Sequence, residues 1–384
     1  MRVKIESFLR EVCEKTTKNN EYPVLTSLKS GLFLQSDYFN KQVASTDNTG
    51  YKIIKKGQFT YRAMSDTGEF YPNMLECVDV GIVSPAYPVF EIFQTDIIIP
   101  EYLKYYFKSN AFQHAISSFA QGSTRTSVKF NKLKTASIDL PSKQEQTKIL
   151  RLLKKAETLI ACRQQELHKL DDLVKARFVE MFGDPENNSF DWKEQPLSKH
   201  LDVVGGFAFK SDQFVEEGIP VLRIGNINAG YFKPVNMVFW DNDDNLKKYK
   251  LFPGDLVMSL TGTVGKDDYG NVCILGNDYD EYYLNQRNAK LELKDSINKY
   301  YISTLLKFES IKKKLTGISR GIRQANISNK DILNLVVPIP NITTQIEFEQ
   351  FVQQIDKSKF VESIHVLKLI KEAIAKEVSH DRIR

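Results

Sequence analysis

The stretch between Pro141 and Gly183 constrains the fold of this chain more than any other feature. It contains no glycine or proline between those two residues, and as one helix it would be about 60 Å long. Ser142, with Glu145 three residues later, can form an N-terminal capping box, and Gly183 followed by Pro185 provides a stop. The sequence therefore predicts a single long helix with defined ends.

The apolar residues of this helix recur alternately four and three residues apart, which is the heptad pattern of a coiled coil. The expected seam consists of Ile149, Leu153, Ala156, Ile160, Leu167, Leu170, Val174 and Met181, with Arg163 and Arg177 at two further register positions. Such a seam is buried only when it packs against another helix. The chain must therefore supply a partner helix.

An internal repeat supplies that partner. A Gly-x-x-Arg loop, an Asn, an aliphatic-Pro pair and a Gln occur in this order in residues 122–146 and again in residues 317–345. A second run without glycine or proline, residues 341–384, follows the second copy, although its seam is broken once between Ile355 and Phe360. Two helices that follow similar segments can pair antiparallel.

The expected fold class is therefore α+β, with a pseudo-two-fold internal repeat. Two similar, β-rich α/β domains are separated by two long antiparallel helices that form a coiled-coil spacer. The expected boundaries are residues 1–141 for the first domain, 142–183 for the central helix, 184–340 for the second domain and 341–384 for the C-terminal helix.

Composition agrees with this division and excludes several classes. A chain of 384 residues is too long for one core, and 42% apolar with 26% charged residues is typical of a folded soluble protein. The four cysteines are isolated, so neither a zinc site nor a disulfide framework is indicated. Without a signal peptide or a long apolar run, we expect a cytoplasmic protein with no membrane partner. A net charge of +5 permits a nucleic-acid partner without requiring one.

Motifs for catalysis are weak. Residues 84–87, Ser-Pro-Ala-Tyr, differ by one residue from a motif with which amino methyltransferases hold a flipped base. No glycine-rich cofactor loop precedes them, so a turn between two strands is the better interpretation. Residues 262–266 lack the spacing of a phosphate-binding loop, and the five histidines are scattered. We expect no catalytic, cofactor-binding or metal-binding residues on this chain.

Binding motifs are stronger, because an Arg-bearing loop stands just before each long helix. Hydroxyls, glycine amides and a guanidinium at close range suit a phosphate backbone. A surface turn that caps a neighbouring helix is the alternative, and recurrence in both halves favours DNA contact. The loop candidates are Ser123, Thr124, Arg125 and Thr126 in the first half, and Ser319, Arg320, Arg323 and Gln324 in the second.

A second set of candidates has the side chains that pair with base edges or phosphates. In the second half these are Lys210, Arg223, Asn226, Thr261, Thr263, Asn285, Gln286 and Arg287, and in the first half Lys55, Lys56, Tyr61 and Arg62. Taken residue by residue, solvated strand faces explain them equally well.

The segment from Leu140 through Gln146 and Arg163 to Pro185 resembles the central conserved region of the specificity subunit of type I restriction-modification systems. Residues 254–259, residues 284–287 and the two Gly-x-x-Arg loops are also similar to that family. The resemblance covers the whole chain in layout. It is weaker in the first half, where residues 83–86 read Val-Ser-Pro-Ala instead of the Leu-Asn-Gln run.

The resemblance implies two target recognition domains that each read one part of a bipartite double-stranded DNA sequence, with the conserved helices setting the gap. It implies a subunit without catalysis or bound cofactor. Methyltransferase (modification) subunits would supply S-adenosylmethionine chemistry, and a restriction and translocase subunit would use ATP and Mg. Two other interpretations remain: a coiled-coil scaffold with protein-binding ends, and a self-contained DNA methyltransferase or endonuclease.

Overall fold

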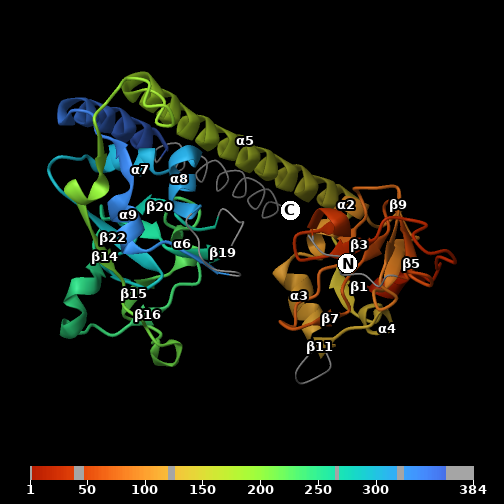
Figure 1. The fold of residues 1–384 in the computed structure, drawn as a ribbon. Coiled ribbons are helices and arrows are strands. Elements are labelled where there is room, and N and C mark those ends of the chain that lie inside the picture. Colours follow the sequence, from red (N-terminus) through yellow and green to blue (C-terminus); the bar gives the residue numbers. More distant parts are fainter. Residues whose placement is uncertain (1, 39–46, 120–125, 264–267, 318–323, 360–384) are drawn as a thin grey trace, which may run out of the picture. The chain divides into compact units, whose positions relative to one another are not determined.

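The computed structural model describes residues 2–38, 47–119, 126–263, 268–317 and 324–359. The chain divides into two compact units, and the boundary between them falls inside the long helix α5, between Ile160 and Ala161. Each unit combines a small antiparallel sheet with short helices (Figure 1). They are called unit 1 and unit 2 below, in chain order.

Unit 1 is built on a four-stranded sheet whose short strands carry aromatic side chains into the core. Its strand order is β2 (Leu9–Val12), β10 (Val89–Ile92), β6 (Phe59–Thr60) and β8 (Asn73–Met74). Three helices complete the core: α2 (Pro100–Tyr106), α3 (Asn110–Ser117) and α4 (Phe130–Leu133). Phe59 stacks on Phe90 with ring centroids 5.7 Å apart, and Phe107 of the α2–α3 connection packs edge-on against Phe59 at 5.6 Å. These rings join strands and helices into one apolar core.

Smaller pairings surround this sheet. They are β1 (Arg2–Lys4) with β12 (Ser137–Asp139), β3 (Leu25–Ser27) with β4 (Leu32–Leu34), β5 (Lys52–Lys55) with β9 (Val80–Val83), and β7 (Met64–Ser65) with β11 (Thr126–Ser127). The 3-10 turn η1 (Ile5–Ser7) and the short helix α1 (Gln35–Tyr38) complete unit 1.

Unit 2 repeats the plan. Its main sheet has the order β14 (Leu201–Gly205), β22 (Asn288–Leu293), β18 (Leu256–Ser259) and β20 (Val272–Ile274), followed by helices α7 (Lys299–Leu305), α8 (Glu309–Thr316) and α9 (Asn329–Asn334). Two-stranded pairs again flank it: β13 (Glu194–Pro196) with β24 (Val336–Pro338), and β19 (Thr261–Thr263) with β23 (Gln324–Asn326). The turn η2 (Leu197–Lys199) stands where unit 1 has η1.

A second sheet of unit 2 has the order β16 (Phe239–Trp240), β15 (Ile219–Leu222), β21 (Tyr282–Leu284) and β17 (Lys250–Leu251). The short elements η3 (Ser211–Gln213), α6 (Ile224–Ile227) and η4 (Asp244–Tyr249) lie in its connections. In both units a main sheet of equal strand order is followed by three helices, so the structure confirms the predicted repeat of two similar α+β units.

One side-chain contact repeats atom for atom. Gln146, fully buried, accepts a hydrogen bond from Ile99 N–H at 2.8 Å and donates to the Pro141 carbonyl at 2.9 Å. Gln345, also fully buried, accepts from Asn298 N–H at 2.8 Å and donates to the Pro340 carbonyl at 2.8 Å. Each glutamine joins the start of a long helix to the N-cap residue of α2 or α7 in its own unit. The repeat therefore includes this buried amide bridge.

Helix α5 (Lys143–Phe182) is continuous, as the sequence predicts. Its capping box forms, because Ser142 N–H donates to Glu145 at 2.7 Å and Glu145 N–H donates to Ser142 Oγ at 3.3 Å. Gly183 ends the helix with φ at 80°, a left-handed conformation that favours glycine, and its N–H donates to the Val179 carbonyl at 2.8 Å.

Within unit 2, α5 packs antiparallel against a helix that the structure describes over residues 342–359. Arg163 Nη2 donates to the Lys359 carbonyl at 2.7 Å, whereas further along α5 Phe182 contacts Phe348 with ring centroids 5.5 Å apart. The predicted antiparallel pairing of the two helices is correct, but the buried residues differ from the predicted seam. Phe178 and Phe182, which were not among the predicted seam residues, are buried, whereas the predicted Ile160 is 47% exposed. Residues 360–384 of the predicted second helix lie outside the described residues.

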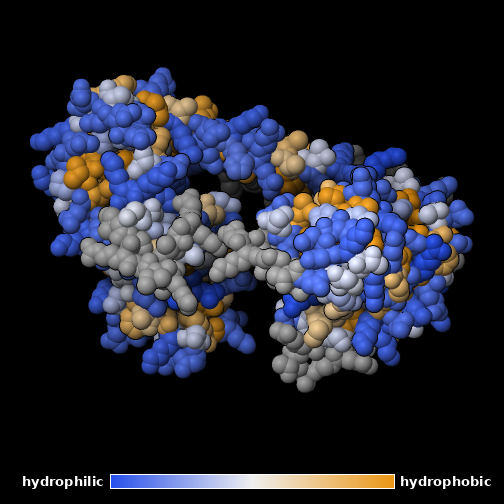
Figure 2. All heavy atoms as spheres, turned by 45° about the vertical axis from the view of Figure 1, so that its right-hand side comes forward, coloured by the Kyte–Doolittle hydropathy of each residue, from blue (hydrophilic) through white to orange (hydrophobic). Residues whose placement is uncertain are grey.

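Hydrophilic residues cover most of the face that Figure 2 shows, with hydrophobic residues in patches among them. Among the helices in the described part of the chain, none is long and apolar enough to span a membrane.

Candidate nucleic-acid interface

The candidate site of unit 2 is one edge of its second sheet. Strands β15 and β21 are parallel neighbours, with Leu222 opposite Leu284. Their carboxyl ends therefore share an edge, at which Arg223 follows one strand and the turn 285–287 follows the other. The loop after β14 joins the same edge, because Phe207 forms a bridge with Asn285. Parallel pairing thus brings together segments far apart in the sequence.

Three hydrogen bonds fix the backbone of the turn 285–287, whereas the side chains of Gln286 and Arg287 are exposed. Asn285, 8% exposed, accepts through Oδ1 from Arg287 N–H at 3.2 Å. Gln286 N–H donates to the Phe207 carbonyl at 2.9 Å, and the Arg287 carbonyl accepts from Leu260 N–H at 2.8 Å. Within the described residues, the exposed side chains of Gln286 and Arg287 make no hydrogen bond or ion pair. Asn285 shapes the turn, and Gln286 and Arg287 point to solvent.

Glycine is required where the neighbouring loop crosses this turn. A Cβ at Gly206 would lie 2.2 Å from the Asn285 carbonyl oxygen, closer than any real contact. This explains why the sequence has a glycine at position 206, before Phe207. Lys210, exposed, follows in the same loop, just before η3.

The ribbon of β19 and β23 lies beside the turn, since Leu260 and Arg287 are hydrogen bonded. Thr261, 9% exposed, donates to Asn326 Oδ1 at 3.2 Å, and Thr263 donates to Asp268 Oδ2 at 2.9 Å. Both hydroxyls are therefore engaged within the ribbon. Ser319, Arg320 and Arg323 lie outside the described residues, and of Gln324 only the backbone, paired with Thr263, is described.

Asn226 is not a base reader, and that prediction is wrong. The residue is 2% exposed, and its Nδ2 donates to the carbonyls of Lys233 and Val235 at 3.0 Å each. Its Oδ1 accepts from Arg223 N–H at 3.0 Å. The Arg223 guanidinium in turn donates to the Asn236 carbonyl. Both side chains hold the chain segment that follows α6.

Unit 1 has a corresponding edge. The turn 84–87 follows β9 as the turn 285–287 follows β21, and Thr60 Oγ1 donates to the Pro88 carbonyl at 2.9 Å beside it. Arg62 is exposed there and pairs with Asp66 at 3.7 Å. Thr126, in the β7–β11 ribbon, donates to the Ser65 carbonyl at 3.1 Å. Ser123, Thr124 and Arg125 lie outside the described residues.

Three candidates of unit 1 do not join this edge. Tyr61 has no exposed surface, donates to the Val128 carbonyl at 2.9 Å and lies in the core, so its prediction as a DNA contact is wrong. Burial raises the pKa of its hydroxyl. Lys55 lies opposite Val80 at the far end of antiparallel β9, and Lys56 follows it. They form ion pairs with Glu14 at 2.7 Å and Asp79 at 3.4 Å.

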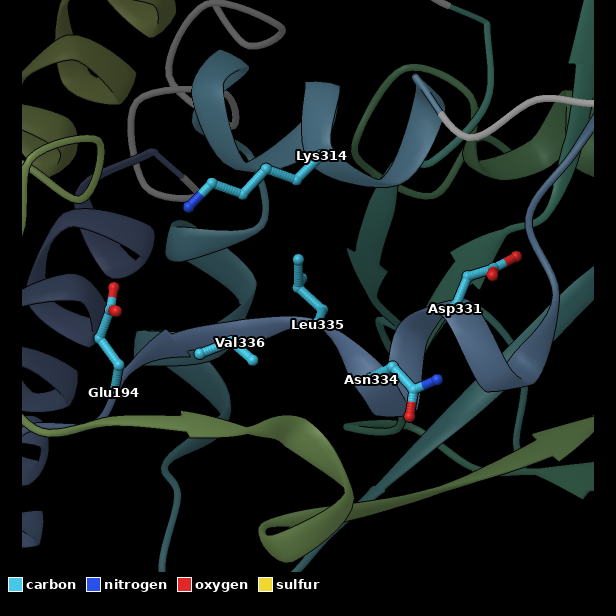
Figure 3. A pocket seen from close by; sticks show the side chains of 6 residues that line it. All are labelled: Glu194, Lys314, Asp331, Asn334, Leu335 and Val336. Carbon is cyan, nitrogen blue, oxygen red and sulfur yellow. The ribbon is translucent and has the colours of Figure 1, made fainter.

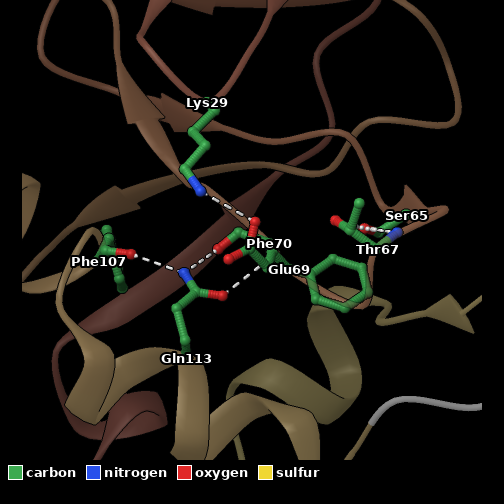
Figure 4. A network of polar contacts seen from close by, with 7 residues as sticks. All are labelled: Lys29, Ser65, Thr67, Glu69, Phe70, Phe107 and Gln113. Carbon is green, nitrogen blue, oxygen red and sulfur yellow. Dashed lines mark hydrogen bonds and ion pairs between the residues drawn. The ribbon is translucent and has the colours of Figure 1, made fainter. Parts of the chain in front are cut away.

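The loop after β7 is fixed by one helix side chain. Gln113 of α3 accepts from Phe70 N–H at 3.1 Å and donates to the Phe70 carbonyl at 2.8 Å, as Figure 4 shows. Lys29 pairs with Glu69 at 3.1 Å in the same loop. Ser65 and Thr67 hydroxyls lie 3.3 Å apart at its start. The loop beside Arg62 is therefore preformed.

A surface pocket of about 420 Å³ lies elsewhere in unit 2. In Figure 3, Lys314 extends from α8 above the strand that carries Val336, with Glu194 to one side and Asn334 to the other. None of the edge residues lines it. Among the described residues, no group of three or more His, Cys, Asp or Glu side chains could hold a metal ion.

Residues 6–171 and 190–371 match the family model of the type I restriction modification DNA specificity domain. These two ranges cover most of the chain, which therefore belongs to this family. The resemblance stated from the sequence is confirmed.

Two curated relatives show the same class. The chain is 28% identical over 242 residues to the type I restriction enzyme MjaVIII specificity subunit of Methanocaldococcus jannaschii, covering 57% of this chain and 55% of the relative. It is 23% identical over 199 residues to the StySPI specificity subunit of Salmonella potsdam, covering 48% and 41%. The chain thus spans about half the length of the curated relatives it matches.

A solved chain from a type I R-M system aligns over 98% of this chain and 96% of its own length, with 15% identity and a TM-score of 0.49.

Proposed function

We propose that this chain is the DNA-specificity subunit of a type I restriction-modification complex and that it works in the cytoplasm. Units 1 and 2 each recognise one part of a bipartite double-stranded DNA target. Gln286 and Arg287 contact bases in unit 2, because amide and guanidinium groups pair with adenine and guanine edges in the major groove. Arg62 and the preformed loop beside it act at the corresponding edge of unit 1.

The observation that carries this proposal is the repeated edge. In both units a turn lies beside a two-stranded ribbon and follows a strand with a parallel neighbour, through the pairing of β15 with β21 in unit 2 and the bridge between Val24 and Ile82 in unit 1. The main sheets of the two units have equal strand order. Repeated scaffolds with different side chains at one edge suit a protein that reads two different sequences with one architecture. A scaffold protein would not need exposed polar side chains such as Arg62, Gln286 and Arg287 at the same edge of both units.

The chain contributes recognition and not chemistry. Methyltransferase subunits supply S-adenosylmethionine, and a restriction and translocase subunit uses ATP and Mg. The exposed faces of α5 are available to dock those partners, since four basic residues along it are exposed: Lys148, Arg151, Lys154 and Lys155.

The test is a methylation map. The chain is expressed with its methyltransferase subunits in a host without other adenine methyltransferases, and methylated positions are located by single-molecule sequencing. We expect a motif in two parts that disappears without this chain. Arg287→Ala should reduce sequence selectivity in one part of the motif and Arg62→Ala in the other. Each lost base contact should cost about 1–3 kcal/mol of discrimination against the wrong base. Methylation without sequence preference, or labelled methyl transfer by the isolated chain, would refute the proposal.

A further inference from the structure

The connection from β15 to β16 differs most between the two units. In unit 1 the corresponding hairpin of β3 and β4 closes with a tight turn, in which Leu28 N–H donates to the Gly31 carbonyl at 2.9 Å. In unit 2 the chain instead runs through α6 and a long loop before it re-enters the sheet at β16. That loop, residues 228–237, is called the α6 loop below.

The α6 loop lies at the candidate edge. Val221 N–H donates to the Val238 carbonyl at 2.9 Å, which places both ends of the connection beyond the carboxyl end of β15. The turn 285–287 extends from the same end of the parallel neighbour β21. The α6 loop and the turn that carries Gln286 and Arg287 therefore leave the sheet at the same end.

Side chains that point into unit 2 fix the conformation of the α6 loop. Asn226, almost completely buried, bridges the carbonyls of Lys233 and Val235, as described above. Phe232 points inward, with its ring 5.3 Å from that of Tyr282 in an edge-on contact. Asn236 adopts a φ of 51°, a left-handed conformation that asparagine tolerates. A buried amide and an inserted aromatic ring hold the loop in one shape.

Other side chains of the α6 loop are exposed to solvent. Tyr231 is 58% exposed and Val235 57% exposed, although Tyr231 adjoins the inserted Phe232 and the Val235 carbonyl accepts from Asn226. The Lys233 ammonium lies 5.0 Å from the centre of the Tyr231 ring. Within the described part of the chain Lys233 forms no ion pair, whereas Lys29 in the short turn of unit 1 pairs with Glu69 at 3.1 Å. A preformed loop thus presents an aromatic ring and an unneutralised cation.

We propose that the α6 loop is a second DNA-contacting segment of unit 2, which rests on the proposed function of the sheet edge. Lys233 binds a backbone phosphate, and the flat face of Tyr231 packs against a sugar or base at the groove edge. Asn226 acts as the positioning residue. Contacts to the phosphates and sugars of a duplex position a protein without reading sequence, while Gln286 and Arg287, at the same end of the sheet, can read base edges. The segment therefore adds affinity and fixes the register of reading.

The experiment uses the full chain assembled with its methyltransferase subunits and a pool of duplexes with randomised sequence. Selection and sequencing give the bound motif, and titration at several salt concentrations gives affinity. Wild-type protein without any selected motif would refute the proposed function itself. With a motif in hand, the variants below test the α6 loop separately.

Tyr231→Ala should weaken binding of the selected duplex about tenfold, the cost of about one lost contact. It should blur only the part of the motif that unit 2 reads, because the register in which Gln286 and Arg287 meet the bases is loosened. Tyr231→Phe should retain the motif, since the ring is kept. Lys233→Gln should weaken all duplexes and reduce the slope of log affinity against log salt by about 0.9, as expected for one lost phosphate contact. Phe252→Ala and Lys199→Gln are the matched controls, because Phe252 is 51% exposed in the turn before β18 and Lys199 is exposed in η2, both at the opposite end of the strands.

Asn226→Ala tests the positioning role. If Asn226 acts through the loop, the losses from Asn226→Ala and Tyr231→Ala should not add in the double variant. Equal behaviour of the Tyr231 and Lys233 variants and their controls would overturn the proposal. So would loss of assembly with methyltransferase subunits at an unchanged motif, because the loop would then serve a protein partner.

Discussion

Replacing Gln345 by methionine tests the buried amide bridge that begins the second long helix. Methionine has a similar volume and no hydrogen-bonding amide, so packing is retained while the polar contacts are lost. Gln345 is fully buried, and its removal leaves Asn298 N–H and the Pro340 carbonyl without their side-chain partner. An unpaired buried backbone group costs about 1–3 kcal/mol.

Two such groups predict a loss of about 2–6 kcal/mol from the free energy of unfolding of unit 2. Asn298 is half-buried, so water can satisfy part of its N–H, and the lower half of this range is expected. Gln146→Met should have the same effect on unit 1, where the side-chain amide bonds the Ile97 carbonyl at 2.8 Å as well. The two variants should therefore destabilise different units.

Urea unfolding followed by hydrogen exchange with mass spectrometry separates the two units, because exchange is read peptide by peptide. Gln353→Met is the matched control: Gln353 is exposed, and its hydrogen bonds are to other side chains, Glu349 at 3.0 Å and Tyr300. That variant should change stability by less than about 0.5 kcal/mol. A Gln345→Met protein as stable as this control, or one that loosens unit 1 peptides instead, would refute the reasoning.

Three further variants test other contacts. Burial, together with the charges of Lys199 and Lys294, lowers the pKa of His200 in the folded protein. The unfolded chain therefore binds the proton more readily, and the free energy of unfolding falls as pH drops below about 6.5. His200→Phe should remove this loss of stability at acid pH. Phe8 holds the equivalent position in unit 1, and urea titrations at several pH values measure the change. Arg163→Ala should destabilise the helix pair of unit 2 by about 2 kcal/mol, since a charged hydrogen bond to the Lys359 carbonyl is lost, and thermal unfolding reports it. Gly206→Ala should displace the turn 285–287 and reduce specific DNA binding, whereas Gly225→Ala, with open space around its Cβ, should not.

The long helix and the repeat were predictable because their signals are local. A run without glycine or proline, a capping box and a recurring order of motifs are readable without knowing what packs where. The aromatic residues of the seam were not predictable from the sequence, because Phe178 is buried by Tyr301 and Phe348, which belong to distant segments. Heptad spacing gives the face of a helix and leaves the partner unspecified.

The candidate site was only partly predictable for the same reason. Tyr61 and Asn226 have side chains suited to DNA, yet both are buried, and burial is decided by sheet pairing and not by residue type. Conversely, Tyr231 and Lys233 carry no motif. What marks them is that their loop leaves β15 at the end where the turn 285–287 leaves β21, and this depends on the parallel pairing of the two strands.

The differences between the units follow a pattern that bears on the target. Strand order, the glutamine bridge and the ribbon beside the edge are the same in both. The edge itself differs: unit 1 has Ser-Pro-Ala-Tyr where unit 2 has Asn-Gln-Arg, and unit 1 has a tight turn where unit 2 has the α6 loop. Contacts that maintain the fold are duplicated, and those that face solvent at the edge are not. Since base identity is read by edge side chains, the two parts of the DNA target should differ in sequence. A palindromic motif in the methylation map would contradict this conclusion.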